Sequence, residues 1–143
     1  MEATVTKLKK NKTAEVWVCL KDFQNKQYVD IREHFLNADD RLWKPTAKGI
    51  MLLPSFLPQV IDGVEALIDI TEVTVVLKFK KSDREEVQIA IREFEGNTYG
   101  EIRAWYWAEG GTQKPGKGVT FKLEIIDGLL EALRNAEELL EAS

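Results

Sequence analysis

Alternating apolar and polar residues predict a β-strand early in the chain. Val16, Val18 and Leu20 would face a core, and the residues that alternate with them, Trp17, Cys19 and Lys21, would form a mixed opposite face. An apolar or β-branched segment and a polar turn precede this strand, so the two strands are predicted to form a hairpin. The same arrangement recurs about 70 positions later.

Two more strands are predicted to follow each hairpin. A tight turn at 24–25 leads to a third strand at about 27–36, and the equivalent turn at 95–97 leads to one at about 98–107. A loop that contains Gly, Asp or Asn comes next. We expect a short fourth strand to begin after the Lys-Gly pair of each half.

Each half then ends in apolar residues at helical spacing. In the first half they run from Val60 to Ile68, after Pro54, a residue that suits a helix start. In the second half they run from Ile125 to Leu140. The predicted order is four strands and a helix, twice, and the two apolar stripes can bury each other.

The two halves also repeat each other in sequence. Residues 23–32 align with residues 94–103 at a shift of 94 − 23 = 71, and four of these ten positions are identical. Lys-Pro, Lys-Gly and Ile-Asp-Gly steps then occur once in each half. A duplication of this extent without a linker indicates two similar units, 1–71 and 72–143, packed as an internal pseudo-dimer. We predict an α+β fold of two tandem ββββα repeats, and a functional surface that both repeats build.

Composition excludes several classes of protein. The 143 residues contain one cysteine and one histidine, Cys19 and His34, which are too few ligands for a zinc site and allow no internal disulfide. No apolar run reaches the roughly 18 residues that a membrane span needs. We therefore expect no cofactor, a cytosolic protein, and a Cys19 that is buried or half-buried in its strand.

Acidic charge is concentrated in the predicted helical segments. Residues 50–77 sum to −4 and residues 123–143 to −5, so with a net charge of −4 the rest of the chain sums to +5. One face can therefore present a positive field to phosphates. The alternative is that both helices have solvated acidic faces without further consequence.

The sequence does not indicate an enzyme. Residues 111–118 nearly match the phosphate-binding loop of nucleotide hydrolases, but Gly118 stands where Ser or Thr must hold magnesium, and a β-prone segment follows instead of a helix. His34 has no evident nucleophile partner, and it aligns with Trp105 in the second half. We expect neither ATP hydrolysis nor another catalytic activity.

Residues 21–35, the Lys-Pro and Lys-Gly steps and the helix after Pro54 together resemble the positive cofactor four family of transcriptional coactivators and its bacterial and phage relatives. The Asp-Ile-Arg-Glu segment at 30–33, in a matching order of strands, is the most specific part. The resemblance covers nearly all of the first copy and, more weakly, the second. It implies a core of four curved antiparallel strands and a helix, which pairs through its helices and binds single-stranded DNA.

The resemblance also implies which residues contact DNA: an aromatic and a lysine at the turn, the strand arginine, an aromatic that closes that strand, and two loop lysines. In the first copy these are Phe23, Lys26, Arg32, Phe35, Lys44 and Lys48. In the second copy they are Phe94, Arg103, Tyr106, Lys114 and Lys117. Because Asn97 replaces the turn lysine and Glu95 precedes it, the second copy is expected to bind phosphates less strongly.

Physical chemistry supports such a site independently. Aromatic rings stack on unpaired bases for about 1–3 kcal/mol each, while lysine and arginine follow the backbone. Further candidates on the mixed strand faces are Trp17, Lys21, Arg92 and Trp107. For each aromatic the alternative is a place in the core. Arg32 and Phe35 are three residues apart, so a bulge or a strand end near Glu33 or His34 is needed to bring both to one face.

The sequence therefore predicts a single-stranded DNA-binding protein with little sequence preference, acting in transcription regulation or in DNA replication, recombination or repair. One alternative is a coactivator-like adaptor that binds transcription or replication proteins through its acidic helices. Another is a protein that binds single-stranded RNA, since nothing in the residues excludes a 2′-hydroxyl. We expect a monomer, cytoplasmic and nucleoid-associated in a prokaryote or nuclear in a eukaryote.

Overall fold

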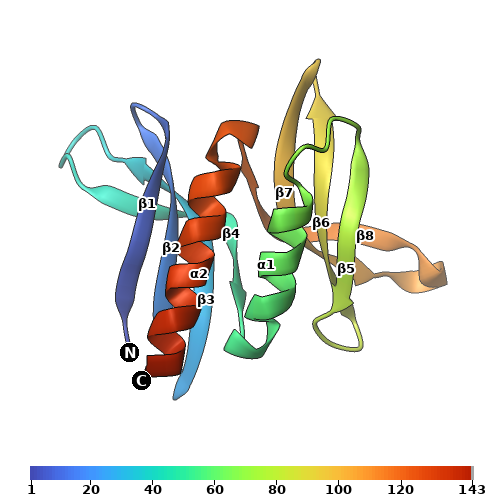
Figure 1. Cartoon of the computed structure of the whole chain (residues 1–143), viewed down its shortest axis with the longest axis horizontal. Helices are drawn as coiled ribbons and strands as arrows, with labels where there is room; N and C mark the ends of the chain where they lie inside the picture. Colours follow the sequence, from blue (N-terminus) through green and yellow to red (C-terminus); the bar gives the residue numbers. More distant parts are fainter. Residues whose placement is uncertain (143) are drawn as a thin grey trace.

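The computed structural model describes residues 1–142, which form two four-stranded antiparallel sheets and two α-helices (Figure 1). The first repeat consists of β1 (Ala3–Asn11), β2 (Ala14–Phe23), β3 (Lys26–Leu36), β4 (Trp43–Leu52) and α1 (Leu57–Ala66). The second consists of β5 (Thr74–Lys80), β6 (Glu85–Phe94), β7 (Asn97–Trp107), β8 (Gln113–Phe121) and α2 (Ile126–Ala142). The predicted ββββα order, twice, is confirmed. Short 3₁₀ turns precede both α-helices, and the first of them begins at Pro54.

The fourth strand of each repeat begins earlier than predicted. β4 starts at Trp43 and β8 at Gln113, so the Lys-Pro and Lys-Gly steps lie inside strands rather than before them. Proline is tolerated there because β4 and β8 are the last strands of their sheets, where a missing N–H need not interrupt a ladder. Most of the near-match to a phosphate-binding loop is likewise strand β8.

Tight turns close the β2–β3 and β6–β7 hairpins, as predicted. Gln24 and Asn25 have φ angles of 51° and 65°, and residues 95–96 have 51° and 81°. Two successive residues with positive φ are typical of a type I′ turn, whose twist matches that of paired strands. The turn fixes the register in which Phe23 pairs with Lys26.

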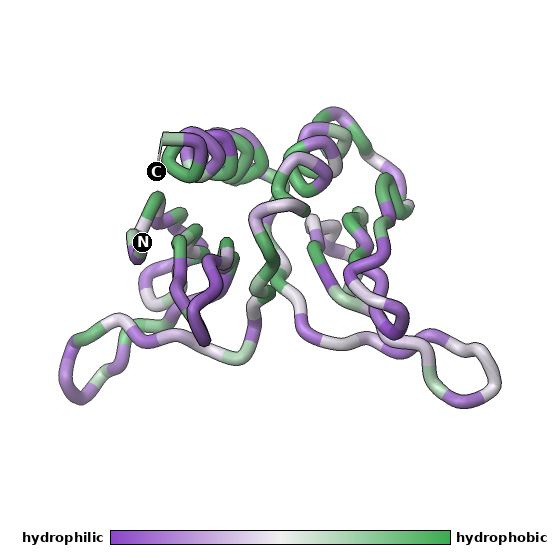
Figure 2. Tube along the Cα trace, turned by 90° about the horizontal axis from the view of Figure 1, so that it is seen from below, coloured by the Kyte–Doolittle hydropathy of each residue, from purple (hydrophilic) through white to green (hydrophobic). Residues whose placement is uncertain are grey.

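Each helix covers the sheet of the other repeat. α2 packs on β1 and β2, whereas α1 packs on β5 and β6. The two helices run antiparallel to each other in one layer, and both sheets lie on the same side of that layer (Figures 1 and 2). The predicted burial of one apolar stripe against the other is confirmed, and each stripe also closes the sheet of the opposite repeat.

Both repeats contribute to one continuous hydrophobic core. β4 and β8 lie next to each other where the two sheets meet, without joining them into one sheet. The core combines residues from both sheets and both helices, among them Val16, Val18, Ile31, Ile89, Ile102, Phe121, Val64, Leu129 and Leu133. Neither repeat therefore buries its apolar residues alone.

The glycine of each Ile-Asp-Gly step lets a helix approach the opposite sheet. A Cβ atom on Gly63 of α1 would lie 2.3 Å from Ile89 of β6. A Cβ atom on Gly128 of α2 would lie 3.0 Å from Leu8 of β1. The repeated glycines thus mark two equivalent helix–sheet contacts, of which the one at Gly63 is the tighter.

We expect Gly63→Ala to lower the free energy of unfolding by about 1–3 kcal/mol, because overpacking against Ile89 outweighs the gain in helix propensity from glycine to alanine. Gly128→Ala should be close to neutral, since a small shift of the Leu8 methyl group relieves its contact. Urea unfolding of the two variants beside the parent chain measures the difference. A larger loss at Gly128 would contradict this account of the two contacts.

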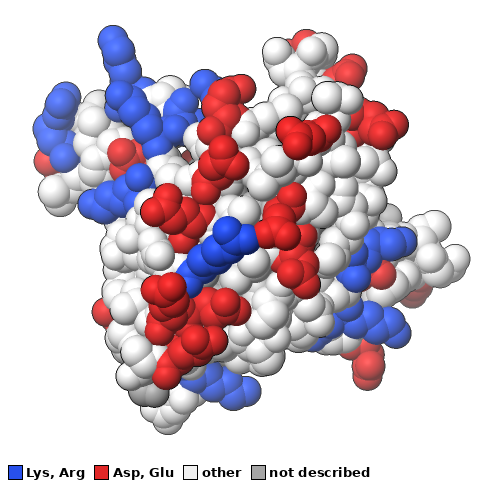
Figure 3. All heavy atoms as spheres, in the orientation of Figure 1, with Lys and Arg blue, Asp and Glu red and all other residues white. Residues whose placement is uncertain are grey.

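Acidic side chains gather over the helix layer. Figure 3, which views the molecule from the helix side, shows carboxylates across both helices and most of the visible Lys and Arg near the margins. Arg134 of α2 pairs with Glu65 of α1 inside this acidic area. The predicted concentration of acid on the helices is confirmed. No helix in residues 1–142 has the length and apolar character needed to cross a membrane.

Candidate nucleic-acid interface

The face of the first sheet that points away from α2 carries most of the residues predicted for the first repeat. Regular pairing of β2 with β3 places Trp17 opposite Arg32 and Phe23 opposite Lys26, with Lys21 on the same face between them. Phe23 is 55% exposed at the end of β2, and Lys26 is exposed beside it. The structure therefore brings these five residues onto one surface, as predicted.

Arg32 is held within this surface by contacts to its own repeat. Its guanidinium pairs with Asp30 at 3.0 Å and donates a hydrogen bond to the carbonyl of Thr46 at 2.8 Å. The side chain lies across Gly49 of β4, where a Cβ atom would come within 2.7 Å of it. Arg32 thus fixes the shape of β4, and Asp30 offsets part of the charge that it can offer to a phosphate.

Arg103 repeats this arrangement in the second sheet. It pairs with Glu101 at 3.0 Å and donates to the carbonyl of Gly116 at 2.8 Å, and it lies against Gly118. The glycine of each Lys-Gly step therefore makes room for an arginine. The lysine before each glycine is left exposed, which makes it the more available cation.

A bulge lies opposite Glu33, where one is expected, but it belongs to β4. β3 stays in register with β2 as far as Phe35, whereas β4 places residues 46–48 opposite Glu33 alone. Because β3 keeps its period of two, Phe35 and Arg32 point to opposite faces. The expectation that a bulge brings both to one face of their own sheet is wrong.

The outer ends of β3–β4 and β7–β8 form two arms that extend in opposite directions, on the side away from the helices (Figure 2). Phe35 pairs with Lys44 on the first arm, and Tyr106 pairs with Lys114 on the second. Lys44 also contacts Asp40 at 2.7 Å, and its hydrogen bond lowers the pKa of the Asp40 carboxyl. Each arm therefore carries an aromatic residue beside a lysine.

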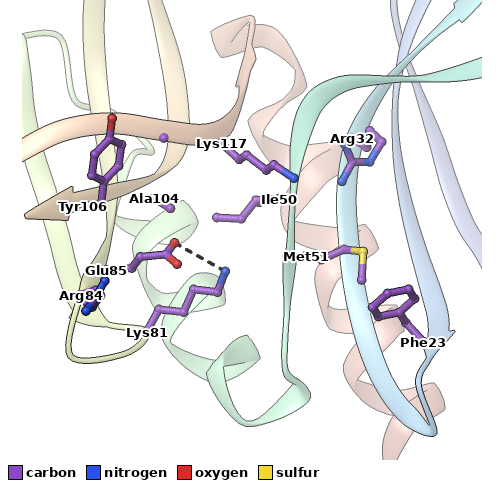
Figure 4. Close-up of a pocket in the computed structure, with 11 residues that line it drawn as sticks. Phe23, Arg32, Ile50, Met51, Lys81, Arg84, Glu85, Ala104, Tyr106 and Lys117 are labelled. Carbon is purple, nitrogen blue, oxygen red and sulfur yellow. Dashed lines mark ion pairs between the residues drawn. The ribbon is translucent and has the colours of Figure 1, made fainter.

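A groove of about 670 Å³ lies between the two repeats (Figure 4). Phe23, Arg32 and Met51 of the first repeat line one side of it. Tyr106 and Ala104 of β7 line the other side, with the helices behind the groove in this view. We call this the composite groove, because residues of both repeats form it.

The composite groove brings together residues that their own sheets keep apart. Tyr106 is the equivalent of Phe35, so the aromatic that closes the third strand of one repeat meets Phe23 and Arg32 of the other. Tyr106 is 43% exposed, which leaves its ring accessible. The packing of the two repeats therefore brings a third-strand aromatic to the same surface as Arg32, which no bulge within β3 does.

Several cations line the composite groove. Lys117 of β8 extends between its two sides, and Lys81 and Arg84 lie at its second-repeat edge (Figure 4). Lys81 pairs with Glu85 at 3.8 Å, whereas Lys117 makes no ion pair within residues 1–142. The groove therefore offers aromatic and cationic side chains together.

The open face of the second sheet holds the predicted Arg92 and Trp107. The guanidinium of Arg92 lies 5.3 Å from the ring centre of Trp105, and the ammonium of Lys80 lies 5.8 Å from that of Trp107. These cation–π contacts engage both partners within the protein. Phe94, at the end of β6, is 65% exposed and is the most accessible aromatic of this face.

The sequence model of the family described as "Transcriptional Coactivator p15 (PC4)" matches the chain twice, over residues 7–62 and 80–132. The chain belongs to the PC4 family. The two matches fall on the two ββββα repeats, so the tandem arrangement is a feature of this PC4 chain. Membership of the PC4 family supports a function in nucleic-acid binding or coactivation in general.

Two crystal forms of BPSL1147, a PC4 homolog from Burkholderia pseudomallei K96243, are similar to part of the chain. The orthorhombic form is 28% identical, with a TM-score of 0.42, and the match covers 45% of this chain and 85% of that one. The tetragonal form is 20% identical, with a TM-score of 0.42, and the match covers 46% and 97%. No curated protein matches the chain.

Trp17 is engaged inside the first PC4 repeat. Its ring stacks on His34, with ring centres 4.0 Å apart and planes 10° apart, and the Lys7 ammonium lies 4.3 Å from its centre. His34 is buried, and the loss of water lowers the pKa of its imidazole. The Trp17 ring is therefore already in contact with two side chains of the protein, and it is less available to stack on a base.

Acidification should destabilise the fold through His34. The unfolded chain binds a proton at this histidine near pH 6.5, whereas the folded chain does so only at lower pH. The contribution of neutral His34 to the free energy of unfolding is therefore complete above about pH 6.5. It is lost as the pH falls toward the lowered pKa of the folded chain. Thermal unfolding at about pH 7.5 and about pH 5 measures this loss. His34→Phe should lose less stability over that range than the parent chain, and an equal loss would refute the assignment.

Sequence reasoning missed the groove residues Met51, Lys81, Arg84 and Ala104. No local pattern marks them, and Lys81, Arg84 and Ala104 line the same groove as Phe23 only because the two repeats pack together. The 71-residue shift does align Lys81 with Lys10, in the basic turn after the first strand. That alignment was the one available signal.

The described residues offer no evident metal site. Within residues 1–142, no group of three or more His, Cys, Asp or Glu side chains is placed to hold an ion. Cys19 is a buried free thiol, as expected, and burial raises its pKa. The aromatic and cationic side chains of this interface can supply stacking, hydrogen bonds and charge neutralisation.

Proposed function

We propose that this PC4-family chain binds single-stranded DNA in the composite groove, with little sequence preference and without catalysing a reaction. The observation that carries the proposal is the placement of two exposed aromatics, Phe23 and Tyr106, from different repeats around one groove. Lys117 and Arg32 supply positive charge between them.

Each part of the groove matches a part of a single strand. Unpaired bases present π faces, and stacking one on an aromatic ring contributes about 1–3 kcal/mol whatever the base. Phosphates neutralised by Lys117 and Arg84 release counterions, so log K should fall with log salt by about 0.7 for each phosphate. A duplex keeps its bases paired and stacked inside, so it gains the charge contribution alone.

The distribution of charge favours the same side of the molecule. Carboxylates gather over the helix layer (Figure 3), and the composite groove opens on the side away from those helices (Figure 4). A polyanion is therefore repelled from the helices and drawn toward the groove despite the net charge of −4.

A titration of tryptophan fluorescence with oligo-dT of about 20 nucleotides tests the proposal, since Trp17 pairs across the sheet with Arg32, which lines the composite groove. We expect quenching that weakens between low and high salt and that the matching duplex does not compete away. No response at low salt would refute binding at this surface. Repeating the titration with oligo-U determines whether RNA is an equal ligand.

A coactivator-like adaptor is the second candidate function, and the helix layer favours it. A hollow between α1 and α2 is lined by four acidic residues and one arginine, Arg134, together with Asn135, Ile68 and Leu130. A basic, partly apolar segment of a transcription or replication protein is chemically complementary to such a surface. Capture of such a protein that persists in high salt and needs no nucleic acid would support this function.

The cellular role follows from the ligand. A protein that coats single strands is suited to transcription regulation or to DNA replication, recombination or repair. Because one chain supplies both repeats, we propose that it acts as a monomer. Its location would be the nucleoid in a prokaryotic cytoplasm or the nucleus of a eukaryotic cell.

A further inference from the structure

The repeat relation defines a counterpart to the composite groove. Replacing the two aromatics, the strand arginine and the Lys-Gly lysine of the groove by their equivalents in the other repeat gives Phe94, Arg103, Phe35 and Lys48. We call these four residues the counterpart surface. Lys48 and Arg103 line one hollow between the repeats, so the two strands that carry them meet there as the relation requires, and Lys117 borders this hollow as well as the composite groove.

The difference in charge between the third strands of the two surfaces lies next to the arginine. Ala104 lines the composite groove, and its equivalent 71 positions earlier is Glu33. The two residues occupy the same place in their sheets, since Ala104 pairs with Val87 and Glu33 pairs with Val16. The composite groove therefore has a methyl group at this position, and the counterpart surface has a carboxylate.

The Glu33 carboxylate holds two lysines. One of its oxygens pairs with Lys10 of β1, and the other lies 3.9 Å from the ammonium of Lys48. The side chain of Glu33 is only 11% exposed, whereas that of Lys48 is 72% exposed. The carboxylate is thus fixed within the protein and reaches out to a cation of the counterpart surface.

Among the described residues, no carboxylate joins the two equivalent lysines of the composite groove, and only one of them has a carboxylate partner. Lys81, the equivalent of Lys10, pairs with Glu85 at the edge of the groove. Lys117, the equivalent of Lys48, has no carboxylate partner within residues 1–142. The difference in charge between the two surfaces therefore depends on Glu33.

We propose that Glu33 competes with nucleic-acid phosphate for Lys10 and Lys48, so that a single strand binds first in the composite groove and more weakly at the counterpart surface. This inference rests on the proposed function. It assigns the difference in affinity to two surfaces that each combine residues of both repeats. The sequence alone predicts instead that the first repeat binds more strongly than the second. A phosphate that reaches Lys48 must displace a carboxylate, whereas one that reaches Lys117 displaces only water and counterions.

The test compares Glu33→Ala with the reciprocal Ala104→Glu. Binding of fluorescently labelled oligo-dT is measured by anisotropy at several salt concentrations. Glu33→Ala should tighten binding and steepen the log–log salt slope by about 1.4, which is 0.7 for each of two released lysines. Because Ala104 is buried, the fold of Ala104→Glu is verified first by thermal unfolding, and the folded variant should bind more weakly with a shallower slope. An unchanged slope in both variants would overturn the proposal.

Phe23→Ala and Phe94→Ala report on the two surfaces separately. In the parent chain, Phe23→Ala should weaken binding about tenfold and Phe94→Ala less than about threefold. When Glu33→Ala is also present, the loss from Phe94→Ala should rise to about tenfold. Equal losses from the two substitutions in the parent chain would overturn the inequality.

Failure of this inference is distinct from failure of the proposed function. If the parent chain does not bind oligo-dT at low salt, the proposed function fails. If it binds, and the variants behave alike, only the role of Glu33 fails. Glu33→Gln keeps the size of the side chain and removes its charge, so it replaces Glu33→Ala if thermal unfolding shows that the alanine variant is destabilised.

Discussion

Replacing Phe23 and Tyr106 together with alanine should weaken the binding of oligo-dT by about 100-fold. Each substitution removes one base stack, and a stack of about 1.4 kcal/mol, within the usual range of 1–3, corresponds to a factor of ten. Both side chains are exposed, so their removal should leave the fold intact. Anisotropy of a labelled oligonucleotide measures the loss, and thermal unfolding verifies the fold.

The control for this double variant is Leu139→Ala. Leu139 is an apolar residue of α2 that is 40% exposed, and α2 lies in the helix layer behind the groove. Its substitution should not change binding. A tenfold loss from Phe23→Ala with none from Tyr106→Ala would place the strand on the first sheet alone. That outcome would refute the composite groove and leave nucleic-acid binding in place.

The repeat and the strands could be predicted from sequence because their signals are local. Alternation at Val16, Val18 and Leu20 reflects a buried face, and the tight turn at 24–25 reflects two residues with positive φ. The start of β4 could not be predicted from such signals. Its Lys-Pro step is tolerated only because β4 is the last strand of its sheet, which is a property of the whole sheet.

The exchange of helices was beyond sequence reasoning for a different reason. The apolar stripes of α1 and α2 are chemically alike, so either stripe can cover either sheet. Gly63 fits against Ile89 and Gly128 against Leu8, and these are contacts between repeats that no local pattern shows. The repeated Ile-Asp-Gly step marked these positions without indicating which sheet they meet.

Strand periodicity predicts which candidate residues share a face of one sheet, but not which residues of the two repeats form one surface. Phe23, Lys26 and Arg32 share a face because they follow the period of two in paired strands. Phe35 does not join them, because β3 has no bulge of its own. The ion pair of Arg32 with Asp30 was foreseeable, since residues two apart on a strand share a face.

Residues 1–71 alone should not form a stable monomer. Their sheet is covered by α2, whose Leu129 and Leu133 are fully buried, and the shared core also loses Phe121. Burying one such side chain contributes about 1.5–3 kcal/mol, so three of them amount to much of the 5–15 kcal/mol that stabilises a typical domain. Circular dichroism should show a largely unfolded fragment at low concentration.

The fragment can restore a cover for its sheet only with a helix from another chain. At high concentration we therefore expect residues 1–71 to pair with a second copy, each α1 covering the partner's sheet. Mixing with residues 72–143 should give a one-to-one complex, because that fragment supplies the α2 that fits Leu8 of β1. Sedimentation velocity distinguishes these species. A fragment that is monomeric and as stable as the full chain would show that the covering helix of the opposite repeat is dispensable.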